Sequence, residues 1–343
     1  MIRPFARLLS ATALVALLVP VFPASAQQNV PPAPDAAAPQ APAPEQPAAE
    51  PTAPAPSAAP VFPKPDPANF TAASPTKETV DAFFTANWGY DETRIWQVEA
   101  ILKTPVDGVS KVVVYVGDKT GKNKPQAFAF YAMPDGKHII AGDDIVNFGE
   151  NPYAETRDLL AQRANGPYRN SAAKDLEIVE FADFQCPHCK EAQANMEQLA
   201  QDFPKARIVF QVFPIAAIHP ASVQAASYGL CVSKLGGSSA FFQFAAAVFA
   251  GQDGLATPDG ATLTLNSAVV KAGLDPTKVA ACAATPEIKA DIDASIKLAS
   301  DIGINSVPTL VVNGREIPVS QLPYDVLKKI VEFQAKRDGV SLQ

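Results

Sequence analysis

A Cys-Pro-His-Cys motif at the junction of a strand and a helix constrains the fold of this 343-residue chain more than any other feature. Residues 176–182 are an apolar, β-rich run that predicts a strand, and residues 190–201 continue from the motif as a helical stretch. Cys186 therefore stands at a helix N-terminus, where free backbone N–H groups and the positive end of the helix dipole stabilise a thiolate. The sequence predicts a lowered pKa for Cys186.

The other residues of the motif have positions that suit thiol-disulfide exchange. Cys189 lies one helical turn further in, within bonding distance of Cys186 but less exposed, as a resolving thiol would be. Pro187 fits the first turn because it lacks a backbone N–H that would be unpaired there. His188 lies between the cysteines, where its imidazole can add positive charge or a hydrogen bond to the thiolate.

Two other interpretations of the paired cysteines stay open: half of a zinc site, or a purely structural disulfide. A zinc site needs two further ligands, but Cys231 and Cys282 are not a second closely spaced pair, and the chain has 3 histidines. A strand-to-helix junction is also the context in which redox-active pairs occur. We therefore expect a catalytic pair, with no metal and no other cofactor.

Residues 1–26 have the layout of a secretory signal peptide. They begin with two arginines, continue in an apolar stretch over residues 8–22, and end in Ala-Ser-Ala. A membrane anchor is the alternative, but the apolar stretch is shorter than the roughly 20 residues that a spanning helix needs. In an oxidising compartment an even number of cysteines favours two disulfides, and the close spacing of Cys186 and Cys189 favours their pairing with each other.

Composition argues against nucleic-acid binding and identifies a linker after the signal peptide. The 28 Lys and Arg residues against 35 Asp and Glu residues leave no basic excess, so a nucleic-acid-binding role is not indicated. Residues 31–67 are almost all Pro and Ala with scattered polar residues. Such a composition predicts a disordered, solvated linker over residues 27–73.

Residues 74–150 are predicted to form a small α+β domain. A helix is expected over residues 77–88, with Ser74 and Pro75 as cap and first turn. Four strands follow at about 95–102, 111–116, 126–133 and 137–141, separated by Gly-containing turns. Residues 151–171 then contain a linking helix that starts with Asn151 as its cap and Pro152 at its first position.

The motif and its surroundings resemble the thioredoxin superfamily, and Cys-Pro-His-Cys is similar to the active site of DsbA-type periplasmic disulfide oxidoreductases. The resemblance covers residues 172–333. It implies an α/β, thioredoxin-like catalytic domain over residues 172–343 with a helical insertion at about 214–306. It also implies a strongly lowered cysteine pKa and an oxidising disulfide.

Further positions match this family. Glu180 resembles an acidic group that helps to move the proton of the inner cysteine, and burial would raise its pKa; an edge-exposed Glu180 without a role is the alternative. Val307 and Pro308 resemble the site at which a cis proline faces the disulfide and the preceding backbone pairs with an extended substrate segment. Val307 is similar to the oxidases, whereas isomerase relatives commonly have Thr there.

The resemblance continues into the insertion. Phe241, Phe242 and Phe249 have helical spacing and indicate core packing. Cys231 and Cys282 fall where some DsbA relatives carry a second, structural disulfide, with two buried free thiols as the alternative. His219, followed by proline, resembles a recurrent family pattern; we expect it at the start of a helix, and a role in a substrate groove is the weaker alternative.

Together these features predict an exported, periplasmic thiol-disulfide oxidoreductase that introduces disulfides into reduced client proteins and is reset by a membrane redox partner. A small domain followed by a linking helix is similar in layout to the DsbC and DsbG isomerases, so a homodimeric isomerase or reductase is the alternative. A redox-inactive periplasmic chaperone or binding protein is a third, which the intact cysteine pair disfavours.

Overall fold

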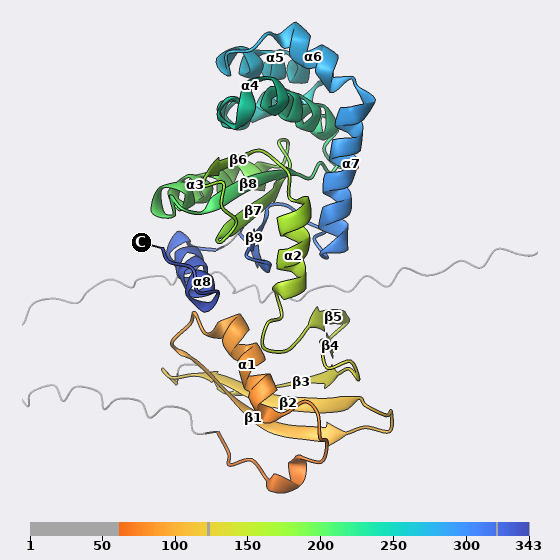
Figure 1. Cartoon of the computed structure of the whole chain (residues 1–343), viewed down its shortest axis with the longest axis vertical. Helices are drawn as coiled ribbons and strands as arrows, with labels where there is room; N and C mark the ends of the chain where they lie inside the picture. Colours follow the sequence, from red (N-terminus) through yellow and green to blue (C-terminus); the bar gives the residue numbers. More distant parts are fainter. Residues whose placement is uncertain (1–61, 122–123, 320–321, 343) are drawn as a thin grey trace, which may run out of the picture. The chain divides into compact units, whose positions relative to one another are not determined.

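The computed structural model describes residues 62–121, 124–319 and 322–342 (Figure 1). The expected signal peptide and most of the expected Pro/Ala-rich linker lie outside these residues. Within the described part of the chain, none of the helices is both long enough and apolar enough to cross a membrane.

The first folded part is one helix packed on an antiparallel sheet with strand order β1-β2-β3-β4-β5. The helix α1 (Lys77–Trp88) buries Val80, Phe83 and Phe84 against the sheet. The strands are β1 (Arg94–Lys103), β2 (Ser110–Asp118), β3 (Gln126–Ala132), β4 (His138–Ala141) and β5 (Asp144–Asn147). The first four agree with the predicted strands to within a few residues, and β5 is not among the predicted ones.

Both predicted helix caps in this half of the chain are wrong. Thr76 rather than Ser74 caps α1, because its hydroxyl accepts a hydrogen bond from the backbone N–H of Thr79. The helix α2 (Ala154–Arg163) follows Tyr153, so Asn151 and the proline after it lie before the helix.

The second sheet has strand order β10-β9-β7-β8-β6. Its members are β6 (Tyr168–Asn170), β7 (Glu177–Ala182), β8 (Arg207–Val212), β9 (Thr309–Val312) and β10 (Arg315–Pro318). Only β7 and β8 pair in parallel. β6 lies in the stretch expected to link the domains, and it joins the sheet by antiparallel pairing with β8.

Strand β7, which leads to the cysteine motif, is buried along its whole length, as expected of a central strand covered on both faces. Ile178 packs with residues of α3 (Pro187–Asp202) and α8 (Tyr324–Arg337) on one face. Val179 and Phe181 pack with residues of α2 and α7 (Pro286–Asp301) on the other. Side chains alternate along a strand, so Glu180 shares the face of Ile178 and α3. The expected α/β thioredoxin-like fold with a preceding sheet domain is confirmed.

Helices fill the chain between β8 and β9, as the helical spacing predicts. They are α4 (Ser222–Ala250), α5 (Pro258–Lys271), α6 (Pro276–Ala283) and α7, with the short 3-10 helix η2 (Gln252–Ala256) after α4. Helix α4 packs against α5 and α6 (Figure 1) and breaks at Gly237, whose φ of 78° and ψ of 179° are open to glycine at little cost. A disulfide between Cys231 and Cys282 joins α4 to α6.

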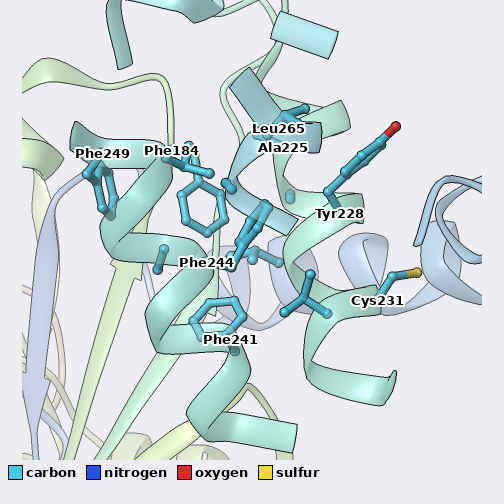
Figure 2. Packing of buried hydrophobic residues seen from close by; sticks show 14 of the residues in the cluster. Phe184, Ala225, Tyr228, Cys231, Phe241, Phe244, Phe249 and Leu265 are labelled. Carbon is cyan, nitrogen blue, oxygen red and sulfur yellow. The ribbon is translucent and has the colours of Figure 1, made fainter. Parts of the chain in front are cut away.

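The aromatic residues of the insertion form the core beneath the cysteine motif. Phe184 lies two residues before Cys186, and its ring centroid is 5.4 Å from that of Phe249 and 5.8 Å from that of Phe244. Figure 2 shows Phe241, Phe244 and Phe249 gathered around Phe184. The insertion therefore anchors the loop that precedes the motif.

Candidate active site

The two cysteines of the motif are the start of α3. Cys186 is the N-cap residue, and Pro187 holds the first helical position. The carbonyl oxygen of Cys186 accepts hydrogen bonds from the backbone N–H groups of Cys189 (3.1 Å) and Lys190 (3.3 Å). Both thiols are free, with Cys186 6% exposed and Cys189 fully buried. Only the first sulfur is thus open to an approaching partner.

The surroundings move the pKa values of the two thiols in opposite directions. The Cys189 thiol donates a hydrogen bond to the sulfur of Cys186, and with the backbone N–H groups of Cys189 and His188 it lowers the pKa of Cys186 to about 6, although burial opposes this. Burial raises the pKa of Cys189, and its hydrogen bond to Cys186 acts in the same direction. The site can therefore hold one thiolate and one thiol at neutral pH.

The imidazole of His188 contacts Glu191 and solvent, and its charge interacts with Cys186. Its side chain is 63% exposed, and its Nδ1 lies 3.0 Å from a carboxylate oxygen of Glu191. The hydrogen bond and charge of Glu191 raise the pKa of His188. Its backbone N–H, rather than an imidazole hydrogen bond, is its main contribution to the Cys186 thiolate. The first helical turn points this side chain outward, which residue order alone does not reveal.

Asp183 is a buried site residue that is not among the predicted ones. Its backbone N–H donates to the sulfur of Cys189 over 3.4 Å, and its carbonyl oxygen accepts from the N–H of Cys186 over 3.1 Å. Its carboxylate accepts from the N–H groups of Gln185 and Ile215, each over 2.8 Å, and meets Nδ1 of His219 at 2.9 Å. The sequence feature that could have identified this residue is an aspartate in the loop, three residues before the first cysteine.

Glu180 is buried, with 3% of its surface exposed, so the alternative of an edge-exposed residue is wrong. Its Oε1 accepts a hydrogen bond from the side-chain amide of Gln193 over 2.7 Å. Burial raises the pKa of Glu180 to about 7, and the Gln193 bond only partly offsets this. Its charge raises the pKa of Cys189. The carboxyl group is thus set to accept or give up a proton near neutral pH.

The loop before β9 faces the first cysteine. The Val307–Pro308 peptide bond is cis, as expected. The carbonyl oxygen of Val307 lies 4.0 Å from the sulfur of Cys186. Val307 packs against the same apolar cluster as Cys186. The two predicted substrate-binding residues therefore lie beside the more accessible sulfur.

The helical insertion also bonds to the backbone of the motif. The buried side-chain amide of Gln252 donates to the carbonyl oxygens of Phe184 and Cys186, each over 2.9 Å. The side chain of Gln185 accepts from the N–H of Ala221 over 2.7 Å and donates to the carbonyl oxygen of Leu255 over 3.1 Å. None of these contacts is predicted from the sequence, since their partners are distant along the chain.

The predicted second pair lies elsewhere in the insertion. Cys231 and Cys282 are joined by a disulfide that closes a separation of 51 residues, with their Cα atoms 5.9 Å apart. Among the residues that the structure describes, three or more His, Cys, Asp or Glu side chains nowhere come together as a metal site.

Relatives among curated proteins match only short parts of their own length. One, 31% identical over 84 residues, is a Na(+)/H(+) antiporter NhaA 3 of Salinispora tropica; the match covers 24% of this chain and 12% of that protein. Another, 27% identical over 146 residues, is a Na(+)/H(+) antiporter NhaA 1 of Salinispora arenicola, with 41% and 20% covered. The chain spans a fifth or less of these proteins, which gives no support for ion transport.

Solved structures of other proteins align with about half of this chain. A thioredoxin-like oxidoreductase from Silicibacter pomeroyi DSS-3 is 26% identical, with a TM-score of 0.45, over 52% of this chain and 98% of that one. Two others are alpha-DsbA2 from Wolbachia pipientis, a thiol-disulfide exchange protein, and DsbA2 from Pseudomonas aeruginosa. The first is 24% identical (TM-score 0.45, covering 52% and 95%), and the second is 26% identical (TM-score 0.42, covering 49% and 93%).

A family model described as thioredoxin matches residues 168–332. This segment contains β6 to β9, the cysteine motif at the start of α3, the cis proline beside it and the helical insertion. The matched part of the chain is therefore a thioredoxin-like domain.

Proposed function

We propose that this protein is an oxidase that introduces disulfides into reduced client proteins. Cys186 is the sulfur that forms the mixed disulfide with the client, and Cys189 is the resolving thiol. The observation that carries the proposal is the opposite displacement of the two thiol pKa values. A stabilised Cys186 thiolate favours the reduced protein, and this makes the oxidised form a stronger electron acceptor.

In the proposed reaction a client thiolate attacks the Cys186 sulfur of the Cys186–Cys189 disulfide. The bond between the two site sulfurs breaks, and the Cys189 thiolate leaves and takes up a proton, with Glu180 as the nearby group that can supply it. A second client thiolate then attacks the client sulfur of the mixed disulfide and releases Cys186 as a thiolate. The client loses two electrons to the site, so the site must be reoxidised before the next cycle.

Val307 and Pro308 are proposed to receive the client beside this sulfur. The Val307 carbonyl oxygen lies 4.0 Å from the Cys186 sulfur, within reach of an extended client segment that binds there. A valine at this position also resembles the oxidases more than the isomerases.

We place the protein in the periplasm, exported by residues 1–26 and separated from them by the linker at 27–73. The Cys231–Cys282 disulfide fits an oxidising compartment. The proposed partners are reduced exported proteins and a membrane redox protein that takes the two electrons from the reduced site.

A dimeric isomerase is the second candidate, and the sheet of the proposed domain 74–150 favours it. Strand β3 pairs with β2 along its length but with β4 only at Tyr131 and Ala132. Among the described residues its Gln126–Phe130 portion has no strand on the second side, and Phe128 there is 47% exposed. An uncharged, open strand edge is a place where a second chain can pair.

A redox titration separates these functions. The full mature chain is equilibrated with glutathione buffers, and the reduced fraction is followed by alkylation of Cys186 and mass measurement. An oxidase should have a potential well above the roughly −270 mV of thioredoxin. A potential as low as that, or efficient reshuffling of a scrambled substrate by a dimer, would assign it to the reductases or isomerases. The Cys186→Ser, Cys189→Ser double variant tests the chaperone alternative. If it binds clients as the wild type does, and the wild type has no more redox activity than this variant, the protein is a chaperone.

A further inference from the structure

We propose that His219 is a positioning residue: held by the buried carboxylate of Asp183, it places a cationic imidazole by the Cys186 thiolate and makes the active-site disulfide a stronger oxidant. This inference rests on the proposed role of Cys186 in thiol-disulfide exchange. It gives the helical insertion a part in the redox chemistry, because His219 lies just before α4, whereas Cys186 caps α3 and Cys189 lies in its first turn.

Asp183 connects His219 to both cysteines of the motif through short contacts. Its backbone N–H donates to the Cys189 sulfur, and its carbonyl oxygen accepts from the Cys186 N–H. Its side chain is fully buried and lies 2.9 Å from Nδ1 of His219. A carboxylate in this place orients the ring through its contact with Nδ1.

A second connection holds His219 on the same side of the motif. Two residues after His219, the N–H of Ala221 donates to the side chain of Gln185, which directly precedes Cys186. Ala221 and Cys186 also belong to the same apolar cluster. The imidazole is only 15% exposed, so solvent screens its electrostatic interactions less than those of an exposed side chain.

The charged groups around the thiolate leave His219 as the better-placed imidazole. His188 also interacts electrostatically with Cys186, but it is exposed and paired with Glu191. Glu180 faces α3 and acts on Cys189. Two of the three hydrogen bonds to the Asp183 carboxylate come from backbone N–H groups, of Gln185 and Ile215, which compensate part of its negative charge. In agreement with this arrangement, the charge of His219 contributes to the lowered pKa of Cys186.

Two variants separate charge from structure. His219→Asn retains a donor near the position of Nδ1 and can keep the bond to Asp183, but it removes the charge. His219→Ala removes both. His138→Asn is the matched control, because His138 forms a similar contact with Asp135 (2.6 Å) in the turn before β4. The readouts are the Cys186 pKa, from thiolate absorbance against pH, and the equilibrium constant with glutathione at pH 7. Thermal unfolding of each variant monitors folding.

Both His219 variants should raise the Cys186 pKa, and His138→Asn should not. A rise of about one unit, from about 6, would lower the oxidising equilibrium constant at pH 7 about fivefold. Unchanged values in His219→Asn would overturn the proposal, whether or not His219→Ala shows a change, because the role of the ring would then be structural. These readouts require only a titrating Cys186 thiol. If the wild-type potential is low, the proposed oxidase function fails, but the difference between variants still tests His219.

Discussion

Gln193 on α3 donates its side-chain amide to Oε1 of Glu180 on β7 over 2.7 Å, and this bond holds a buried carboxyl group on the face of the sheet that α3 covers. A neutral amide only partly offsets the cost of burying a charge. The pKa of Glu180 is consequently raised to about 7, and this has consequences for both stability and catalysis.

Glu180→Gln should remove a pH dependence of stability. Because the folded pKa of Glu180 lies above its unfolded value, the folded chain binds the extra proton, so stability falls as pH rises from about 4.5 to about 7 and then stays constant. At pH 8 the variant should be more stable than the wild type by at most about 3 kcal/mol. Urea unfolding at pH 4, 6 and 8 measures this. Glu332→Gln, an exposed change on α8, is the control and should leave the pH profile unaltered.

The same variant should slow the resolving step. Without a proton acceptor near Cys189, the buried thiol loses its proton more slowly, so mixed disulfides with a client peptide should last longer. Quenched-flow trapping followed by mass spectrometry measures their lifetime. A lifetime equal to that of the wild type would exclude Glu180 from proton transfer.

Cys189→Ala should accumulate mixed disulfides between Cys186 and client proteins, while Cys186→Ser should form none. The more accessible sulfur, that of Cys186, can still react in the first variant, but the thiol that would release the client is missing. The client must carry a disulfide, so that the Cys186 thiolate attacks one client sulfur and the other client sulfur leaves as a thiolate. Non-reducing gels of each variant after reaction with such an unfolded, disulfide-containing client give the answer. Oxidase activity in Cys186→Ser would contradict the assignment of the two sulfurs.

The contribution of Cys186 to the stability of the reduced protein should rise with pH between about 6 and 9. The Cys186 pKa is depressed in the folded state, so its stabilisation is complete above the unfolded pKa and is lost as pH falls through about 6. Allowing for solvent screening, the gain should be about 2 kcal/mol. Denaturant unfolding of the reduced chain tests this. Cys186→Ser has no thiolate and should lack the rise.

The Cys231–Cys282 disulfide should survive a mild reductant that opens the Cys186–Cys189 pair, because Cys231 is fully buried. Replacing both Cys231 and Cys282 by Ala should lower the free energy of unfolding by up to about 4 kcal/mol, by the chain-entropy estimate for a loop of this length. Peptide mapping after differential alkylation and a thermal melt measure the two effects. Alkylation of Cys231 in the native, oxidised protein would show that the bond does not form.

Gln252→Ala should destabilise the protein and loosen the motif. The variant loses two hydrogen bonds to the carbonyl oxygens of Phe184 and Cys186, and leaving buried groups with fewer partners costs about 1–3 kcal/mol. Thermal unfolding and hydrogen exchange at the first turn of α3 should both respond. Gln243→Ala, an exposed change on α4, is the matched control, and an equal effect of the two would reject the proposed contact role.

Local sequence patterns determined much of the fold. Alternating and continuous apolar runs predicted most strands, because the side-chain period of a strand is a property of neighbouring residues. The position of Cys186 at the start of a helix follows in the same way, since the helix N-terminus is formed by the next few residues. Helix caps were less well predicted, as with Thr76, because several residues near a helix start can supply the capping oxygen.

The tertiary structure alone decided which side chains surround the sulfurs. His188 lies between the two cysteines in sequence, yet the helix turns its ring towards Glu191 and solvent. His219 is 36 residues from Asp183, and Gln252 is 66 residues from Cys186, but chain packing brings each of them to the motif. Such contacts depend on how the insertion closes over the sheet. This closure results from burying Phe184 among the aromatic residues of α4, which no local pattern specifies.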